Sequence, residues 1–472
     1  MLFNSYYFIF WFLPIALFFY HLSLRLNRKI FSKIVLLSFS IIFYALWKFD
    51  FLIQFLLIIL ANYVFSILIN KYREIHFNKS RALFYLGLFV NLIFLFYYKY
   101  LFFISEQLSL FLNFDNKFTQ IIMPLGISFF TFIQISYLIE CYQGKVQKNP
   151  RMIDYFQFVT YFPHLIAGPI VLYRELIPQF NDSKNLKTIS FNIALGIFIF
   201  SIGLFKKVGI ADSLDQYSAI AFDQGARDGL RAWLSSLSYT MQLYYDFSGY
   251  MDMAQGISIM FNFKLPQNFN SPFKSLNISD YWRRWHITMT RFFMGYVYMP
   301  LTIKNSRKYI TDSKQKQFFY LEFIPILSTF AIAGIWHGAG WNFLLFGLWH
   351  GFGLTFHRLW QKIKIFKIYP VISWAITFLF VVIGNVFFRS KNVNDAFEIL
   401  YAMFFSWEGN LYHLRYFIFF FIALAGVMLF KNTEQLSQKF STNYKFFAYS
   451  VFLFCFSLYL IDRQIEFLYW QF

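Results

Sequence analysis

Residues 323–356 read FIPILSTFAIAGIWHGAGWNFLLFGLWHGFGLTF, the longest stretch of the chain without Asp, Glu, Lys or Arg. A helix needs about 20 mostly apolar residues to cross a bilayer, so this stretch is long enough for two passes. The small residues at positions 338–340 are a natural place to turn or unwind, because glycine tolerates backbone conformations that other residues avoid. The stretch therefore predicts two membrane helices with a short break between them.

The composition of the whole chain indicates the same class. Hydrophobic residues make up 58% of the 472 residues, aromatic residues 25% and charged residues 14%, whereas a soluble domain has about 25% charged residues. A soluble fold could not bury so many rings, and disorder, collagen and small disulfide-stabilised modules are excluded. Only helices and closed barrels span lipid, and the alternation over about ten residues that marks a barrel strand is absent. We expect an all-α polytopic membrane protein with about 11 to 13 membrane segments, some of them re-entrant.

The basic residues are distributed as in a membrane protein. Lys and Arg number 42 against 23 Asp and Glu, a formal net charge of +19. They gather in short loops between apolar runs, for example at positions 25–33 and 71–81, on either side of a nearly neutral turn at 47–50. Because cytoplasmic loops carry the excess of Lys and Arg, we expect the N-terminus outside and both basic loops in the cytoplasm. The expected partner of this charge is the lipid bilayer, not nucleic acid.

Residues 264–316 combine many basic residues with many aromatic ones, most densely in YWRRWH at 281–286. This composition suits a helix at the cytoplasmic interface, with its rings inward and its charges toward lipid head groups. Arg283 and Arg284 could instead contact a phosphate-bearing substrate, because guanidinium groups match phosphate oxygens well. The sequence leaves both interpretations open, a membrane-surface anchor and a contact with a phosphate-bearing substrate.

Four polar residues in weakly polar surroundings are candidates for chemistry. His337 lies inside the longest apolar run, where a neutral imidazole can accept a proton near neutral pH or can be a hydrogen-bonded structural group. His350 repeats the same Trp-His-Gly pattern, and His286 follows the basic aromatic stretch. Asp246 would orient a histidine or cap a helix. It does not share a helical face with Asp252, so a carboxylate dyad is not expected.

The common motifs of other enzyme classes are missing. The chain contains no G-x-G-x-x-G, Walker A, G-x-S-x-G or H-E-x-x-H sequence. Its two cysteines, Cys141 and Cys455, have no neighbouring cysteine or histidine cluster, so we expect neither a metal site nor a redox pair.

Seven segments, in order along the chain, resemble the membrane-bound O-acyltransferase (MBOAT) family. The closest subgroup contains alginate and peptidoglycan O-acetyltransferases, and the teichoic acid D-alanyl-transferring proteins are more distant. The matching segments are PLGISFFTF (124–132), FPHLIAGPI (162–170), GLFKKV (203–208) with AD (211–212), YDFSGY (245–250), WRRWH (282–286), WHGAG (336–340) and VFFR (386–389). We expect a single membrane domain over residues 1–472, with an MBOAT-like core at about 100–400 and less typical helices at about 401–472.

The resemblance implies a ring of helices around a tunnel and a histidine-based acyl transfer. His337 corresponds to the family's catalytic histidine and His286 to its second functional position, while His350 matches a weaker position. The expected substrate-binding residues are Arg283, Arg284, Trp336 and Asp246. At positions 294–296 the chain has Met-Gly-Tyr where the subgroup usually has Arg-Asp-Tyr, a departure in the part that would face the donor.

The resemblance also implies substrates and partners. We expect acetyl-CoA as the acyl donor, no bound cofactor or metal, and a separate extracytoplasmic transferase of the SGNH-hydrolase type that completes transfer to a polysaccharide. The heavy use of Phe, Ile, Lys, Asn and Tyr suggests an AT-rich genome, which favours peptidoglycan in a bacterial inner membrane over alginate. Other exopolysaccharides and D-alanyl transfer stay open. A lipid-linked sugar flippase is the alternative from another class, although the inverted repeats usual in transporters are not found. An inactive scaffold of the same fold is a third possibility.

Overall fold

The computed structural model describes residues 2–26, 29–113, 115, 118–119, 121–225, 228–363, 368–406, 411–461 and 467–468. The chain is 81% helical, and the described residues contain no β-strand. This confirms the all-α class. Arg28, in the first of the two predicted basic loops, lies outside the described residues.

The chain divides into two compact units. The first comprises Met1–Leu204, Tyr250–Pro266 and Phe440–Asp462, and the second comprises Phe205–Gly249, Gln267–Lys439 and Arg463–Phe472. The long helix α12 (Gly229–Met260) contributes residues to both. Compact packing units are not by themselves separate domains, so the single membrane domain stays a prediction.

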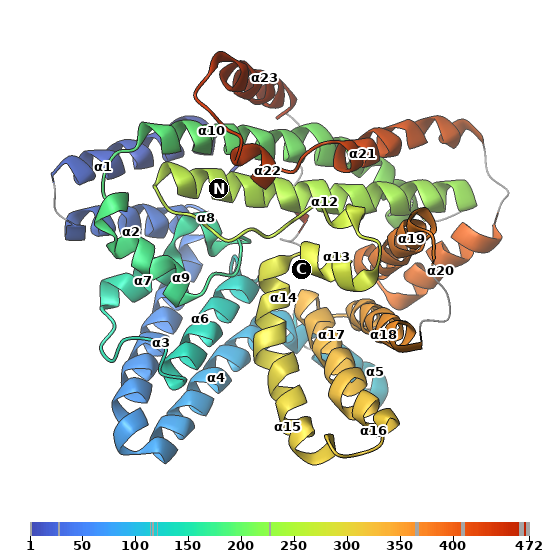
Figure 1. Ribbon diagram of the computed structural model, residues 1–472, viewed down its shortest axis with the longest axis horizontal. Coiled ribbons are helices and arrows are strands. Elements are labelled where there is room, and N and C mark those ends of the chain that lie inside the picture. Colours follow the sequence, from blue (N-terminus) through green and yellow to red (C-terminus); the bar gives the residue numbers. More distant parts are fainter. Residues whose placement is uncertain are drawn as a thin grey trace. The chain divides into compact units, whose positions relative to one another are not determined.

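The first unit is built from many helices of different length. They are η1 (Phe8–Phe12), α1 (Leu13–Arg25), α2 (Lys29–Ala45), α3 (Phe49–Ile75), α4 (Phe77–Lys99), α5 (Leu101–Leu112), α6 (Ile127–Tyr142), α7 (Met152–Thr160), α8 (Phe162–Leu165), α9 (Tyr173–Asn181), α10 (Ser190–Leu204) and α23 (Tyr444–Leu460). Helices α3 and α4 form a hairpin, and α6 packs against both of them (Figure 1).

Three buried carboxamides connect these three helices. Asn62 on α3 donates to Gln134 on α6 at 2.7 Å, and Asn91 on α4 donates to Asn62 at 2.6 Å. Between membrane helices the apolar faces gain little from packing, since lipid is as apolar as they are, and buried polar side chains then help to hold helices together. The Asn62–Asn91–Gln134 contacts therefore fix the register of this bundle.

The second unit contains the elements that carry the expected site. They are η3 (Phe205–Ala211), α11 (Asp212–Phe222), the first part of α12, η4 (Pro272–Lys274), α13 (Ile278–Arg284), α14 (Ile287–Phe293), η5 (Met294–Tyr298), α15 (Met299–Tyr309), α16 (Lys314–Phe318), η6 (Phe319–Phe323), α17 (Ile324–His337), α18 (Trp341–Ile363), α19 (Pro370–Arg389), α20 (Val393–Phe405), η7 (Leu411–Tyr416), α21 (Phe417–Leu429) and α22 (Thr433–Ser437).

Within the part of the chain that the structure describes, six helical segments are long and apolar enough to cross a membrane. They are Phe8–Arg25, Phe49–Ile75, Phe77–Lys99, Ser190–Phe222, Lys314–His337 and Pro370–Arg389, and shorter apolar helices are Ile30–Ala45, Leu101–Leu112, Ile127–Tyr142, His413–Leu429 and Tyr444–Leu460. The chain is therefore a multi-pass membrane protein. The number of crossings and the orientation of the N-terminus stay predictions.

The stretch at 323–356 folds as two helices with a break, as its sequence predicts. Helix α17 ends at His337, helix α18 begins at Trp341, and the two pack side by side (Figure 1). Gly334 and Gly347 allow this approach, because a Cβ on Gly347 would lie 2.2 Å from the carbonyl oxygen of Phe330 and 3.1 Å from the Cα of Gly334. Small residues at such a crossing let the backbones of membrane helices come together.

The first prediction concerns this crossing. Gly347→Ala is expected to destabilise the protein by about 1–3 kcal/mol, because the added methyl group meets backbone that has no room to yield. The measurement is the melting temperature of the detergent-solubilised protein. Gly295→Ala is the matched control, since a Cβ at Gly295 meets nothing within 4 Å. Equal melting temperatures for the two variants would contradict the role of Gly347.

Candidate active site

His337 is the last residue of α17, and its imidazole is surrounded by aromatic rings. The side chain is only 4% exposed. Its ring lies 4.8 Å from that of Trp336, 5.1 Å from that of Phe388 and 5.8 Å from that of Phe346, each in an edge-on arrangement. Gly338 follows in an extended conformation, and a Cβ there would lie 2.1 Å from the ring of Phe343. The glycine therefore lets the chain leave α17 without displacing the aromatic shell of the histidine.

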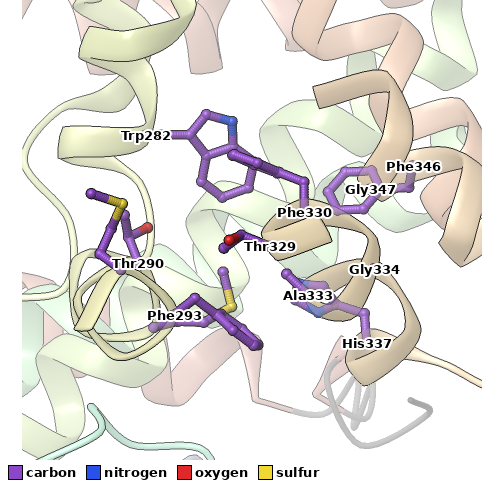
Figure 2. A pocket seen from close by; sticks show the side chains of 12 residues that line it. Trp282, Thr290, Phe293, Thr329, Phe330, Ala333, Gly334, His337, Phe346 and Gly347 are labelled. Atoms are coloured by element: carbon purple, nitrogen blue, oxygen red, sulfur yellow. The ribbon is translucent and has the colours of Figure 1, made fainter. Parts of the chain in front are cut away.

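His337 lines a small cavity between α14, α17 and α18. Figure 2 shows Trp282, Thr290 and Phe293 on one side and α17 with His337 at its end on the other. The full lining is Trp282, Met289, Thr290, Phe293, Met294, Thr329, Phe330, Ala333, Gly334, His337, Phe346 and Gly347. The volume is about 40 Å³, and since roughly 10–15 Å³ accommodates one water molecule, the cavity has room for a small group. It is thus suited to a short apolar group beside a basic nitrogen.

His286 is fully buried and has a left-handed backbone, with φ of 44°. It separates α13 from α14, so the predicted interfacial helix through 281–286 is wrong in this respect: the chain forms two short helices with a break at Trp285 and His286. Tyr281 and Trp282 are buried, as predicted for the rings, and Arg283 is exposed. The orientation of the charges toward lipid head groups stays a prediction.

The hydrogen bonds of His286 define its tautomer. Its Nδ1 lies 3.2 Å from Oδ1 of Asn268, and the same oxygen accepts the backbone N–H of Thr288 at 3.1 Å. A backbone N–H can only donate, so the Asn268 atom is an acceptor and Nδ1 carries a proton. Burial lowers the pKa of His286 to about 3. The imidazole is therefore neutral at pH 7, with the lone pair on Nε2.

The two candidate arginines differ in exposure. Arg283 has a 72% exposed side chain that lies 3.4 Å from the carboxylate of Asp280. Arg284 is 33% exposed, pairs with Asp280 at 3.0 Å and donates to the carbonyl of Asn270 at 3.3 Å. Arg284 thus holds the loop before α13 in place, whereas Arg283 presents its charge to solvent and is the better candidate for an anionic ligand.

The structure gives Asp246 different partners from those expected. Its carboxylate lies 2.7 Å from Nζ of Lys207 and accepts the backbone N–H of Leu468 at 2.9 Å. It sits within α12, so it does not cap that helix, and these two contacts involve no histidine. The expectation that Asp246 orients a histidine directly is therefore replaced by an ion pair with Lys207.

Trp336 and His350 both belong to the surroundings of the cavity. Trp336 is buried against His337 and Phe293, although it does not itself line the cavity. His350 is 1% exposed, and its ring packs 5.0 Å from Trp282 and 4.7 Å from Phe346, two residues that do line it. His286 is not among the lining residues; it packs on Phe247 and Phe269.

Sequence reasoning missed Asn268 and Lys207. Asn268 precedes α13 in an extended segment with no recognisable motif, and only the fold shows that it binds His286. Lys207 lay in the GLFKKV segment, but nothing in the sequence paired it with Asp246. Over the residues that the structure describes, no three His, Cys, Asp or Glu side chains gather as metal ligands would.

The chain is thus an all-helical multi-pass membrane protein with a buried histidine on a small apolar cavity. The chain belongs to the membrane-bound O-acyltransferase family, whose family profile (MBOAT) matches residues 142–389, and it is therefore an acyltransferase. It is 39% identical to a peptidoglycan O-acetyltransferase of Helicobacter pylori, over 85% of this chain and 80% of that protein. It is 36% identical to a probable alginate O-acetylase of Pseudomonas aeruginosa, over 86% of this chain and 75% of that protein. A teichoic acid D-alanyltransferase of Bacillus subtilis is 27% identical over 57% of this chain and 69% of that protein.

Proposed function

We propose that the chain transfers acetyl groups from acetyl-CoA toward the hydroxyl groups of an extracytoplasmic polysaccharide, with peptidoglycan as the first candidate. The observation that carries this proposal is the cavity at His337, whose volume of about 40 Å³ and apolar lining suit a short acyl group. The relatives add support, because those with the higher identities are named as O-acetylating enzymes of peptidoglycan and alginate.

The proposed chemistry needs only groups of this chain and its two substrates. His337 accepts the proton of the acceptor hydroxyl while that oxygen attacks the thioester carbonyl, a general-base step that supplies roughly 10²–10⁴-fold acceleration. The new C–O ester bond forms, the C–S bond breaks, and the proton passes to the thiolate of coenzyme A. No cofactor or metal takes part.

His286 would assist from the acceptor side. In the tautomer set by Asn268, its Nε2 has a lone pair and no proton, so it cannot donate a hydrogen bond to the thioester carbonyl. It can accept one from the attacking hydroxyl. His286 could polarise the thioester carbonyl or orient the acceptor hydroxyl, and this tautomer supports the second role.

The cellular setting follows from the proposed reaction. We place the chain in a bacterial inner membrane with its N-terminus outside, the donor entering from the cytoplasm, and an SGNH-hydrolase-type partner completing the transfer outside. Peptidoglycan ranks before alginate for two reasons. The Helicobacter pylori relative is named as a peptidoglycan O-acetyltransferase, and the residue usage of this chain is typical of AT-rich genomes.

The test uses the full chain in proteoliposomes with acetyl-CoA labelled in the acetyl group. Peptidoglycan fragments or alginate oligomers are supplied on the opposite side, with and without the secreted partner. Alkali-labile label on peptidoglycan supports the proposal. Label on alginate alone would reassign the acceptor, and no hydrolysis or transfer of acetyl-CoA under any condition would overturn the donor assignment.

A second prediction concerns the size of the acyl group. Ala333→Leu is expected to lower acetyl transfer by at least about 10- to 200-fold, because one methylene of misfit in a pocket has that effect and the substitution adds three carbon atoms to a residue that lines the cavity beside His337. Initial rates in the same proteoliposomes are the measurement. Ile332→Leu is the matched control, since Ile332 is exposed and lies outside the lining. A full rate in Ala333→Leu would mean that the acyl group binds elsewhere.

A third prediction concerns the phosphates of the donor. Arg283→Ala is expected to raise the KM for acetyl-CoA about tenfold, the cost of one charge-assisted hydrogen bond, and to leave kcat unchanged because the residue is remote from the reacting atoms. Arg307→Ala controls for loss of a basic residue on an exposed surface. A KM equal to that of the wild type would show that Arg283 faces lipid head groups only.

A further inference from the structure

The residues Phe467 and Leu468, near the end of the chain, are buried in the second unit. They are 2% and 5% exposed. The backbone N–H of Leu468 donates to Oδ2 of Asp246 at 2.9 Å, across a sequence separation of 222 positions. A carboxylate in the middle of α12 thus holds a peptide group from the far end of the chain.

Asp246 is in turn fixed by a buried charge cluster. Nζ of Lys207 lies 2.7 Å from Asp246 and 2.7 Å from Asp212, and all three side chains are less than 5% exposed. Burying a charge costs desolvation free energy, and a buried ion pair is stable only when its partners are held in a fixed geometry. The cluster of Lys207, Asp212 and Asp246 therefore makes a rigid anchor for Leu468.

Phe247 connects this anchor to His286. It follows Asp246 on α12 and is fully buried. Its ring lies 4.8 Å from the His286 imidazole at an interplanar angle of 86°, and 5.9 Å from the ring of Phe467. Phe467 thus packs against Phe247, the residue whose ring contacts the His286 imidazole. The imidazole has Asn268 on its Nδ1 side and Phe247 against its ring.

We propose that Phe467 and Leu468 are positioning residues for His286, acting through Phe247 and anchored by the charge cluster. This inference rests on the proposed acyl transfer, in which His286 orients the acceptor hydroxyl. The part of the chain with the weakest resemblance to the family would then set the geometry of the residue that orients the acceptor hydroxyl.

The test removes the hydrogen bond between Leu468 and the anchor. Leu468→Pro eliminates the N–H that binds Asp246, since proline has no backbone donor, whereas Leu468→Ala keeps it. We expect Leu468→Pro to lower kcat about tenfold without changing the KM for acetyl-CoA, and Leu468→Ala to stay within about twofold of the wild type. Phe467→Ala should behave as Leu468→Pro does, and Phe467→Leu should restore most of the rate.

A second readout does not depend on turnover. Diethylpyrocarbonate modifies accessible histidines, and the labelling of each can be followed by mass spectrometry of its peptide. In Leu468→Pro we expect labelling of His286 to rise several-fold, while His164, also 0% exposed and in the first unit, stays at the wild-type level.

The outcomes separate the two proposals. Wild-type kinetics and labelling in both Leu468→Pro and Phe467→Ala would overturn the positioning role, and so would a parallel rise at His164, which indicates general unfolding. If the wild-type protein transfers no acetyl group, yet labelling of His286 alone rises in Leu468→Pro, the positioning role is kept and the proposed function is overturned.

Discussion

Cells that carry His337→Ala in place of the wild-type gene are expected to have no ester-linked acetate on their cell-wall glycan above background. His337 is the only titratable side chain among the residues that line the cavity. Without it, the attacking hydroxyl has no acceptor for its proton there, and a loss of about 10²–10⁴-fold is the usual size of a general-base contribution. The measurement is acetate released by mild alkali from purified glycan.

The controls for this strain are protein abundance and a matched histidine. An immunoblot must show normal levels of the variant. His76→Ala removes an exposed histidine between α3 and α4 and should leave the acetate unchanged. Unchanged acetate in His337→Ala would remove peptidoglycan as the acceptor and direct the search to alginate and other glycans. If their acylation were unchanged too, the transport of a lipid-linked sugar would become the better hypothesis.

The parts of the fold that the sequence predicts correctly depend on local physics. Residues 323–356 must form helices because lipid offers their backbone no other partners, and the glycines at 338 and 340 stand where the helices separate. His337 could be identified in the same way, as a polar residue in an apolar run with a motif around it. Its place on a cavity wall could not, because other lining residues, such as Trp282 and Thr290, come from a segment about 50 positions earlier in the chain.

The parts that the sequence does not predict depend on long-range contacts. The left-handed backbone at His286 breaks a stretch that reads as one helix, and Asn268, which binds its ring, carries no motif. The ion pair of Lys207 with Asp246 joins two segments that were each recognisable alone. Leu468, bound to Asp246 across 222 positions, falls in the region with the least family signal. Periodicity and composition contain no information on such pairs.

His286→Asn is expected to lower acetyl transfer about 10²-fold with little loss of stability, the effect of a misoriented reactant. Asparagine tolerates the left-handed backbone that position 286 requires, and its amide group can take the place of Nδ1 opposite Asn268. It has no atom at the position of Nε2. His286→Ala is the comparison that loses both functions, so it should be as inactive and also less stable, by melting temperature in detergent. An active His286→Asn enzyme would mean that Asn268 holds the loop and that Nε2 plays no part.

The pH dependence of the wild type and of His286→Asn separates the two possible roles of His286, which are orienting the acceptor hydroxyl and donating to the thioester carbonyl. Burial lowers the pKa of His286 to about 3, so in the wild type the group stays neutral from about pH 5 to 8 and takes up a proton only far below that range. The ratio of the wild-type rate to that of His286→Asn should therefore be constant over this interval, because any titration there belongs to groups that both enzymes share. A ratio that rises as the pH falls through 6 to 7 would mean that an imidazolium at position 286 donates to the thioester carbonyl. The proton on Nδ1 and the lone pair on Nε2 argue for the constant ratio, since a neutral imidazole bound to Asn268 can only accept from the hydroxyl.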